Sequence, residues 1–155
     1  MVQMGTKGCN PIPLGGEVSQ MAKGYIYEHV VIPHDVTDQS ITYDVSYLEW
    51  ASTARERMMV EHLESRPRIL VGETYIRYIT PAFLYDRLEI RVTVGDHNVN
   101  KGRVRLNFRF SNKASGQMLA EGYQIIFFYD WASGKRIPIP DEFLKLVDIG
   151  TVEKL

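Results

Sequence analysis

The chain has 155 residues, which is enough for one domain with a substantial core and too few for two ordinary domains. Hydrophobic residues make up 45% of it, and 18 basic side chains nearly balance 19 acidic ones, which excludes a disordered polyelectrolyte and argues against a nucleic-acid partner. Cys9 is the single cysteine, no apolar run approaches the ~18 residues of a membrane span, and no signal-peptide pattern is visible, so we expect a cytoplasmic protein without a membrane partner.

The N-terminal part of the chain changes character near Tyr25. Residues 1–20 are rich in glycine and proline without any periodicity, which predicts a flexible arm. The stretch YIYEHVVIP is β-branched and aromatic, and it predicts a first strand that ends at Pro33. We expect one domain over residues 21–147 and a C-terminal tail over 148–155.

Apolar residues recur near 3.6-residue spacing after the next turn, which predicts an amphipathic helix. Its expected apolar side consists of Val45, Leu48, Ala51, Met58, Met59 and Leu63. Asp44 stands just before this pattern and is the expected N-cap, because a short acidic side chain accepts hydrogen bonds from the first backbone N–H groups.

Beyond the helix the pattern switches to period two and predicts four more strands, at 70–79, 86–94, 103–110 and 118–130. Turn signals between the last three favour antiparallel hairpins. The helix must hide its apolar side on one face of this sheet. The expected class is therefore α+β, with a five-stranded antiparallel sheet wrapped around one long helix.

This order of elements, with DQSITYDVSYLEWASTARE at the helix start, resembles the hotdog fold and in particular the 4-hydroxybenzoyl-CoA thioesterase-like family. The residues at the motif spacing are Asp44, Tyr47, Trp50 and Arg55. The resemblance extends from Tyr25 to about Phe143. The segments YEHVV and WASTARE are also similar to hotdog thioesterases of enediyne polyketide pathways, which act on chains bound to an acyl carrier protein.

The resemblance leaves two candidates for the catalytic position in the turn. Ser40 stands where the family has a glycine, and Asp38 is one residue closer to it than the family's aspartate. Counted without a gap, Thr37 occupies the catalytic register instead. The enediyne-type enzymes have no acid at this position either, which implies that a mechanism without a carboxylate is possible.

Hydrolysis of a thioester needs a group that attacks or activates water, and donors for the oxyanion. A helix start offers unpaired N–H groups, here those from Asp44 to Ser46. The other expected substrate-binding residues are Tyr43, Val45, Tyr47, Tyr75 and Arg77. Tyr78 is a further candidate, because the resemblance implies that its strand, which also carries Tyr75 and Arg77, borders the substrate tunnel; plain packing is the alternative for all three. Arg55 is a further catalytic candidate, or a structural ion pair, and Asp38 and Asp44 have the structural alternatives of turn former and helix cap.

The remaining polar residues give weaker signals. His34 is a possible base, whereas His29, His62 and His97 have no metal-ligand spacing, so neither a metal nor another cofactor is expected. Four cations near element ends are candidates for contacts with CoA phosphates or an acidic carrier protein. They are Arg66, Arg68, Lys135 and Arg136.

The function expected is hydrolysis of an acyl-CoA or acyl carrier protein-bound thioester, fatty or polyketide. The alternative is a non-catalytic acyl-binding or dehydratase-like hotdog protein, although HDVTDQS does not match the Asp and His signature of a hydratase. The resemblance implies a homodimer with two shared sites, or a homotetramer, because a single sheet with one helix leaves open edges.

Overall fold

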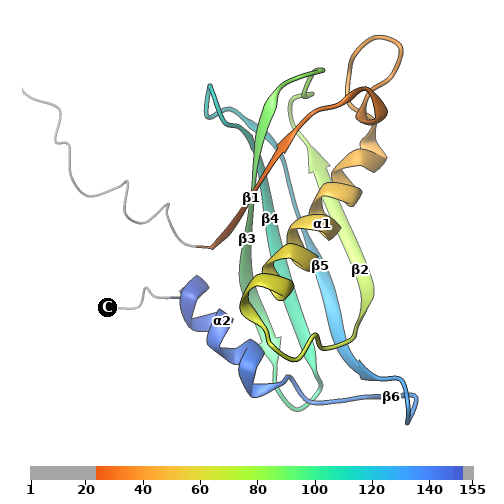
Figure 1. Ribbon diagram of the computed structural model, residues 1–155, viewed down its shortest axis with the longest axis vertical. Coiled ribbons are helices and arrows are strands. Elements are labelled where there is room, and N and C mark those ends of the chain that lie inside the picture. The colour runs from red at the N-terminus through yellow and green to blue at the C-terminus, as the bar shows by residue number, and fades with distance from the viewer. Residues whose placement is uncertain (1–23, 152–155) are drawn as a thin grey trace, which may run out of the picture.

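The computed structural model describes residues 24–151 (Figure 1). Its elements are β1 (Tyr25–Val30), the 3-10 helix η1 (Pro33–Asp35), α1 (Asp44–His62), β2 (Ile69–Tyr78), β3 (Arg87–Asn98), β4 (Arg103–Asn112), β5 (Met118–Asp130), β6 (Lys135–Arg136) and α2 (Asp141–Thr151). The arm expected over residues 1–20, which includes Cys9, and residues 152–155 of the expected tail lie outside the described residues.

The strands form one antiparallel sheet in the order β1-β3-β4-β5-β2, curved around α1 (Figure 1). The three later strands are joined by hairpins, as their turn signals predicted. β1 joins the sheet beside β3, and β2 joins at the other edge beside β5, with Tyr75 opposite Tyr123. The expected hotdog fold is confirmed, with the two-residue β6 on β5 as an addition.

The core lies between α1 and the concave face of the sheet. Alternate residues of β3 and β4 are buried, from Leu88 to Val94 and from Val104 to Phe110, as their period-two pattern predicted. The helix contributes Ser46, Tyr47, Trp50, Ala51, Ala54, Arg55, Met58 and Met59 to its buried face.

Two residues of the predicted apolar stripe of α1 were placed wrongly. Val45 is 51% exposed and Leu48 is 39% exposed. Successive helical residues are about 100° apart, so the buried pairs at 46–47 and 50–51 turn Val45 to the far side and Leu48 to the flank. The aromatic residues Tyr47 and Trp50 define the buried face instead.

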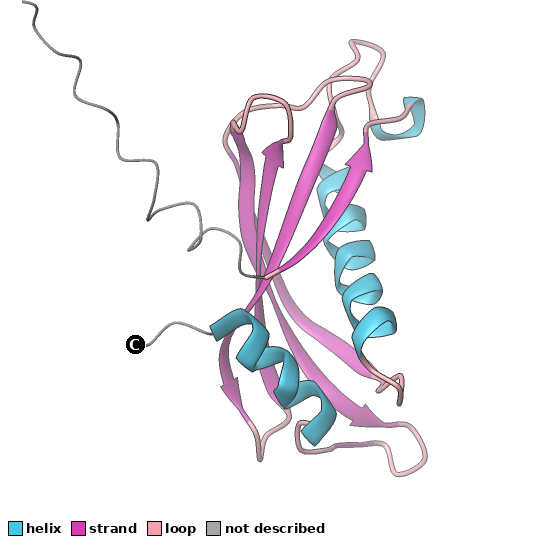
Figure 2. Ribbon diagram, turned by 60° about the vertical axis from the view of Figure 1, so that its left-hand side comes forward, coloured by secondary structure: helices cyan, strands magenta, loops and turns pink. Residues whose placement is uncertain are grey.

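The second helix, α2, was not predicted. It begins directly after Pro140 and packs against β3, with Phe143 edge-on to Phe128 at a ring-centroid distance of 5.0 Å. Figure 2 shows it as a shorter rod beside the sheet. The boundary expected at residue 147 falls inside this helix. Neither helix within the described range combines the length and apolar character needed to cross a membrane.

Candidate active site at the start of α1

The segment that joins β1 to α1 is a small hairpin whose tip carries both catalytic candidates. Val36 pairs with Thr42, and the Thr37 N–H donates to the Ile41 carbonyl at 2.8 Å. The Ser40 N–H donates to the Thr37 carbonyl at 2.9 Å. Ser40 has φ +62°, in the left-handed region that glycine enters without steric cost. Its backbone therefore has the conformation that a glycine would take most easily at this position.

Thr37 and Asp38 have different surroundings. Thr37 is half-buried, and its hydroxyl oxygen accepts the Gln39 N–H at 3.3 Å. Asp38 is exposed and makes no hydrogen bond or ion pair with any described residue. The side-chain hydrogen bond that stabilises the turn thus comes from Thr37. No hydrogen bond among the described residues supports the alternative that Asp38 stabilises the turn.

α1 begins without a side-chain cap. Tyr43 is the N-cap, with extended backbone angles, and Asp44 is the first helical residue, so the expectation that Asp44 caps the helix was wrong by one position. The Ser46 N–H donates to the Tyr43 carbonyl at 3.2 Å. The N–H groups of Asp44 and Val45 donate to no group among the described residues. Two oriented donors therefore stand free at the positive end of a 19-residue helix.

A hollow of about 210 Å³ opens beside these donors. It is lined by Thr42, Asp44, Tyr47, Tyr78, Ile79, Thr80 and Pro81. The Tyr47 oxygen accepts the Thr42 hydroxyl and the Ala82 N–H, both at 3.3 Å, which leaves its own proton available for another acceptor. The Tyr78 hydroxyl donates to the Asp44 carbonyl at 3.0 Å, and burial, with a smaller contribution from the Asp44 carboxylate, raises the pKa of Tyr78. The Tyr78 phenol therefore stays protonated at neutral pH.

Asp35 connects the turn to the start of α1 through hydrogen bonds, and no sequence pattern had identified it as a site residue. Asp35 is 3% exposed. Its Oδ2 contacts His29 Nε2 at 2.8 Å and accepts the Ile32 N–H at 2.9 Å. Its carbonyl accepts the Tyr43 N–H at 2.8 Å and the Ser46 hydroxyl at 3.1 Å. These bonds fix where α1 begins. The signal in the sequence was that Asp35 stands two residues before Thr37. No spacing rule, however, predicts that Asp35 pairs with His29, six residues earlier.

The other histidines do not join this site. His34, the base candidate, is exposed on η1 and makes no hydrogen bond with a described residue. His62 Nδ1 contacts the Met58 carbonyl at 3.0 Å, and His97 Nδ1 contacts the Gly95 carbonyl at 3.3 Å. Within residues 24–151, His, Cys, Asp and Glu side chains form no cluster of three or more that could hold a metal ion.

Arg55 is not brought to the helix start. It lies eleven residues beyond Asp44, about 16 Å along the axis at 1.5 Å per residue. It is 7% exposed, its Nη1 donates to the Gln124 Oε1 at 2.5 Å, and its Nε and Nη2 donate to Glu56. A buried guanidinium needs such partners, so in one chain Arg55 joins the helix to the middle of β5.

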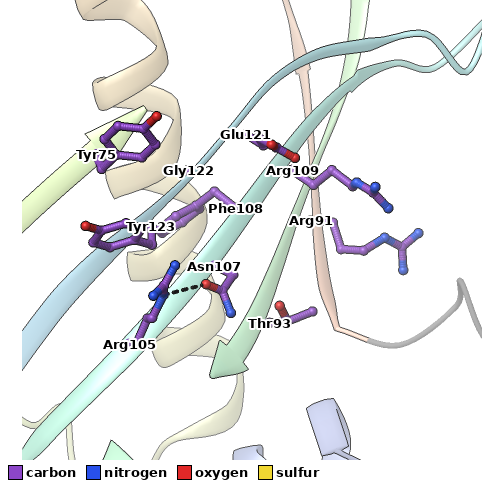
Figure 3. Close-up of a pocket in the computed structure, with 10 residues that line it drawn as sticks. All are labelled: Tyr75, Arg91, Thr93, Arg105, Asn107, Phe108, Arg109, Glu121, Gly122 and Tyr123. Carbon is purple, nitrogen blue, oxygen red and sulfur yellow. Dashed lines mark hydrogen bonds between the residues drawn. The ribbon is translucent and has the colours of Figure 1, made fainter. Parts of the chain in front are cut away.

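Tyr75 and Arg77, expected to bind substrate, are turned away from α1. Figure 3 shows Tyr75, Tyr123 and Glu121 on the convex face of the sheet, where Tyr75 stacks on Tyr123. Arg77 is on the same face of β2 as Tyr75, two residues along the strand, and pairs with Glu121. Their neighbour Tyr78 points the other way, because successive strand residues alternate, and it contacts Tyr47 at a centroid distance of 5.2 Å. Of the three candidates on this strand, Tyr78 alone lies on the side of α1.

Three of the four expected phosphate-binding cations lie near the hairpin that joins β5 to β6, at the end of the molecule away from the turn (Figure 1). Arg68 lies 6.0 Å from the Trp131 ring centroid and Arg136 lies 3.8 Å from that of Phe127. Lys135 and Arg136 form β6 on the hairpin that follows β5. Arg66 is exposed on the loop before β2.

Comparisons with known structures agree with this architecture. The dynemicin thioesterase superposes with a TM-score of 0.74 at 18% identity over 84% of this chain and 99% of its own. A Staphylococcus aureus protein in complex with CoA gives 0.74 at 13% identity over 84% of this chain and 88% of its own. The 1,4-dihydroxy-2-naphthoyl-CoA thioesterase from Synechocystis gives 0.70 at 18% identity over 79% and 94%.

No curated protein matches the sequence. The family model of the thioesterase-like superfamily matches residues 31–147, which include η1, the turn, α1, β2 to β6 and the first part of α2. A match over most of the described chain, on this fold and with this turn at the helix start, shows that the chain belongs to the thioesterase-like superfamily.

Proposed function

We propose that this thioesterase hydrolyses a fatty or polyketide acyl thioester carried by CoA or by an acyl carrier protein, and that it binds the thioester carbonyl at the start of α1. The observation that carries the proposal is that the N–H groups of Asp44 and Val45, at a helix start without a side-chain cap, donate to no group in residues 24–151. The adjacent hollow beside Tyr47 and Tyr78 gives the acyl group a place next to these donors.

The proposed step needs no cofactor. Water adds to the carbonyl carbon, and the carbonyl oxygen becomes an oxyanion that the two N–H groups stabilise. The tetrahedral intermediate then breaks its C–S bond, the free acid forms, and the departing thiolate takes the proton that water has lost. Tyr47, whose proton is not committed to another described group, is a further donor to the oxyanion or to the leaving sulfur.

Thr37 and Asp38 are the candidates for activating water. In the register without a gap, Thr37 takes the catalytic position and its hydroxyl orients the water; Thr37 is also the residue whose side chain accepts a hydrogen bond within the turn. Asp38 is the carboxylate at the tip of the turn and is free to accept a proton from water. The two assignments predict opposite rankings of the corresponding variants.

We propose that the active form is a homodimer, with a homotetramer as a further assembly. β2 is an unpaired edge of the sheet, and exposed Leu70, Val71 and Tyr75 lie along it. A further group of exposed apolar side chains, Tyr43, Val45, Tyr78, Ile79 and Phe83, surrounds the helix start. Pairing of β2 with a second copy would cover both the open edge and this apolar surface.

The positive charge at the hairpin that follows β5 supports a carrier that bears phosphate groups or is acidic. An antiparallel pair of β2 strands places the Arg68 end of one copy beside the Tyr78 end of the other, and Tyr78 contacts the start of α1. Arg68, Lys135 and Arg136 of one copy would then meet phosphates, or an acidic carrier, of a substrate bound at the other. Similar structures that act on or bind CoA compounds support this carrier class.

A panel of acyl-CoA and acyl carrier protein thioesters, followed by release of free thiol, tests the proposal. We expect hydrolysis of at least one class, with Asp44→Pro protein purified in parallel as the control for contaminating esterases. Binding of the acyl compounds without thiol release would favour the non-catalytic alternative and would refute the proposed activity.

A further inference from the structure

The convex face of the sheet carries a hollow of about 400 Å³, on the side away from α1 (Figure 3). Its charged and aromatic lining comes from four neighbouring strands. The residues that matter are Tyr75, Arg91, Thr93, Arg105, Arg109 and Tyr123. Because the helix start lies on the other face, this hollow is separate from the site proposed for the thioester.

Two arginines face each other across this surface. Arg91 on β3 is directly opposite Arg109 on β4 in the strand register, and like charges in such a pair repel. Arg91 is paired with Glu89 at 2.9 Å. Arg109 is opposite Glu121 on β5, but that carboxylate is bonded to Arg77. Arg109 therefore forms no ion pair with a described residue, and its guanidinium is available to an anion.

The other side of the hollow is aromatic. Tyr75 and Tyr123 stack with centroids 5.5 Å apart, and the Arg105 guanidinium lies 4.0 Å from the Tyr123 centroid. The Tyr123 hydroxyl donates to Glu73, and the Arg105 Nε donates to the Asn107 Oδ1 at 3.0 Å. These bonds hold Tyr123 and Arg105 in place, so the surface they present to a flat ring is already formed.

Between the two sides most of the polar groups can donate hydrogen bonds, and the one carboxylate in the lining, Glu121, accepts from Arg77. The Thr93 hydroxyl and the Asn107 amide nitrogen lie between the arginines and the tyrosines (Figure 3). Figure 3 shows the Arg91 and Arg109 guanidinium groups side by side at one end and the two tyrosine rings at the other. Donors and cations at one end with flat rings at the other suit a ligand that has both phosphate and a planar base.

We propose that this hollow binds a phosphorylated nucleoside, with its phosphate between Arg91 and Arg109 and its base against Tyr75 and the Arg105–Tyr123 pair. Two sources have this chemistry, a free nucleotide that acts as an effector and the nucleotide end of a CoA compound. The volume exceeds what inorganic phosphate would fill. The arginines and polar lining do not suit a fatty acyl chain.

Calorimetric titration of the full-length protein with adenosine 3′,5′-bisphosphate tests the site without any need for hydrolysis. We expect saturable binding that Arg109→Ala weakens by tenfold or more and that weakens as salt is raised. Tyr75→Leu should weaken it as well. Arg87→Ala is the matched control, because Arg87 is an exposed arginine of β3 outside the hollow and should leave binding unchanged. Melting temperatures establish that each variant is folded.

Absence of saturable binding at millimolar bisphosphate would overturn the proposal, as would equal affinity for inorganic phosphate or equal loss in Arg87→Ala. Kinetics then identify the source. If the CoA end occupies the hollow, Arg109→Ala raises KM for an acyl-CoA but not for the matching acyl N-acetylcysteamine thioester. If a free nucleotide is the ligand, both KM values stay unchanged while bisphosphate binding is lost.

Discussion

Replacing Asp44 by proline removes its carboxylate and one of the two free N–H groups at the start of α1. Proline is favoured at the first helical position, where its missing N–H has no partner to lose, and it requires an extended residue before it. Tyr43 satisfies this requirement with φ −65° and ψ 145°. The Asp44 carbonyl, which accepts the Tyr78 hydroxyl, is retained. The perturbation is therefore local to the proposed oxyanion donor.

Asp44→Pro should lower kcat much more than Asp44→Ala. Loss of one oxyanion donor typically costs about 10²- to 10³-fold in kcat, or about 2.7–4 kcal/mol, with little change in KM. Asp44→Ala removes the same carboxylate but keeps the N–H, so it should retain kcat to within a few-fold. Both variants lose a favourable acid in the first turn, worth about 0.3–1 kcal/mol, which lowers the melting temperature of each by a few degrees at most.

The assay is steady-state thiol release with the best substrate of the panel, beside thermal melts of the three proteins. Equal kcat in the proline and alanine variants would show that the Asp44 N–H does not stabilise the oxyanion, and the carbonyl would have to bind elsewhere. An equal, large loss in both would instead assign the role to the carboxylate. Either result would refute the reasoning from free N–H groups.

The remaining predictions concern the turn, the assembly and acid stability. If Thr37 holds the catalytic register, Thr37→Val should lower kcat by about a hundredfold or more while Asp38→Asn stays mild, and the reverse ranking of measured kcat values would make Asp38 the base. Light scattering should give the mass of a dimer or tetramer, and a stable monomer at micromolar concentration would contradict the β2 pairing. Hydrogen bonds from Ser65 and the Glu64 N–H lower the pKa of Glu142 from its ordinary value of 4.5. The folded state thus favours the carboxylate, and this stability is present above pH 4.5 and lost as the pH falls through the lowered pKa. Glu142→Gln should therefore reduce the melting temperature at pH 7, with a gap to the parent that closes as the pH falls below 4.5. A gap of constant size in circular-dichroism melts would exclude this linkage.

The sequence by itself determined the local elements and the faces of the central strands. The alternation in β3 and β4 places Leu88 and Val104 inward without reference to any other strand, because the two-residue period is a property of the extended backbone. The start of α1 was also predictable to within one residue, since the change from turn to helical spacing is local. The family resemblance followed from the same stretch.

Contacts between distant segments decided the rest. Val45 and Leu48 looked apolar enough for the core, but the packing of Tyr47 and Trp50 against the sheet chose another side of the helix. Tyr75 faces away from α1 because β2 pairs with β5 in a register that the period-two pattern of β2 alone does not specify.

The candidate site shows the same division. The motif identified the turn and the helix start, which are continuous in the chain. The free donors, the hollow and the part-buried Asp35–His29 pair instead depend on where β1, β2 and α1 meet in space. Hydrogen bonding is satisfied or left open only after such segments are packed together, so no local pattern could show which N–H groups would remain free.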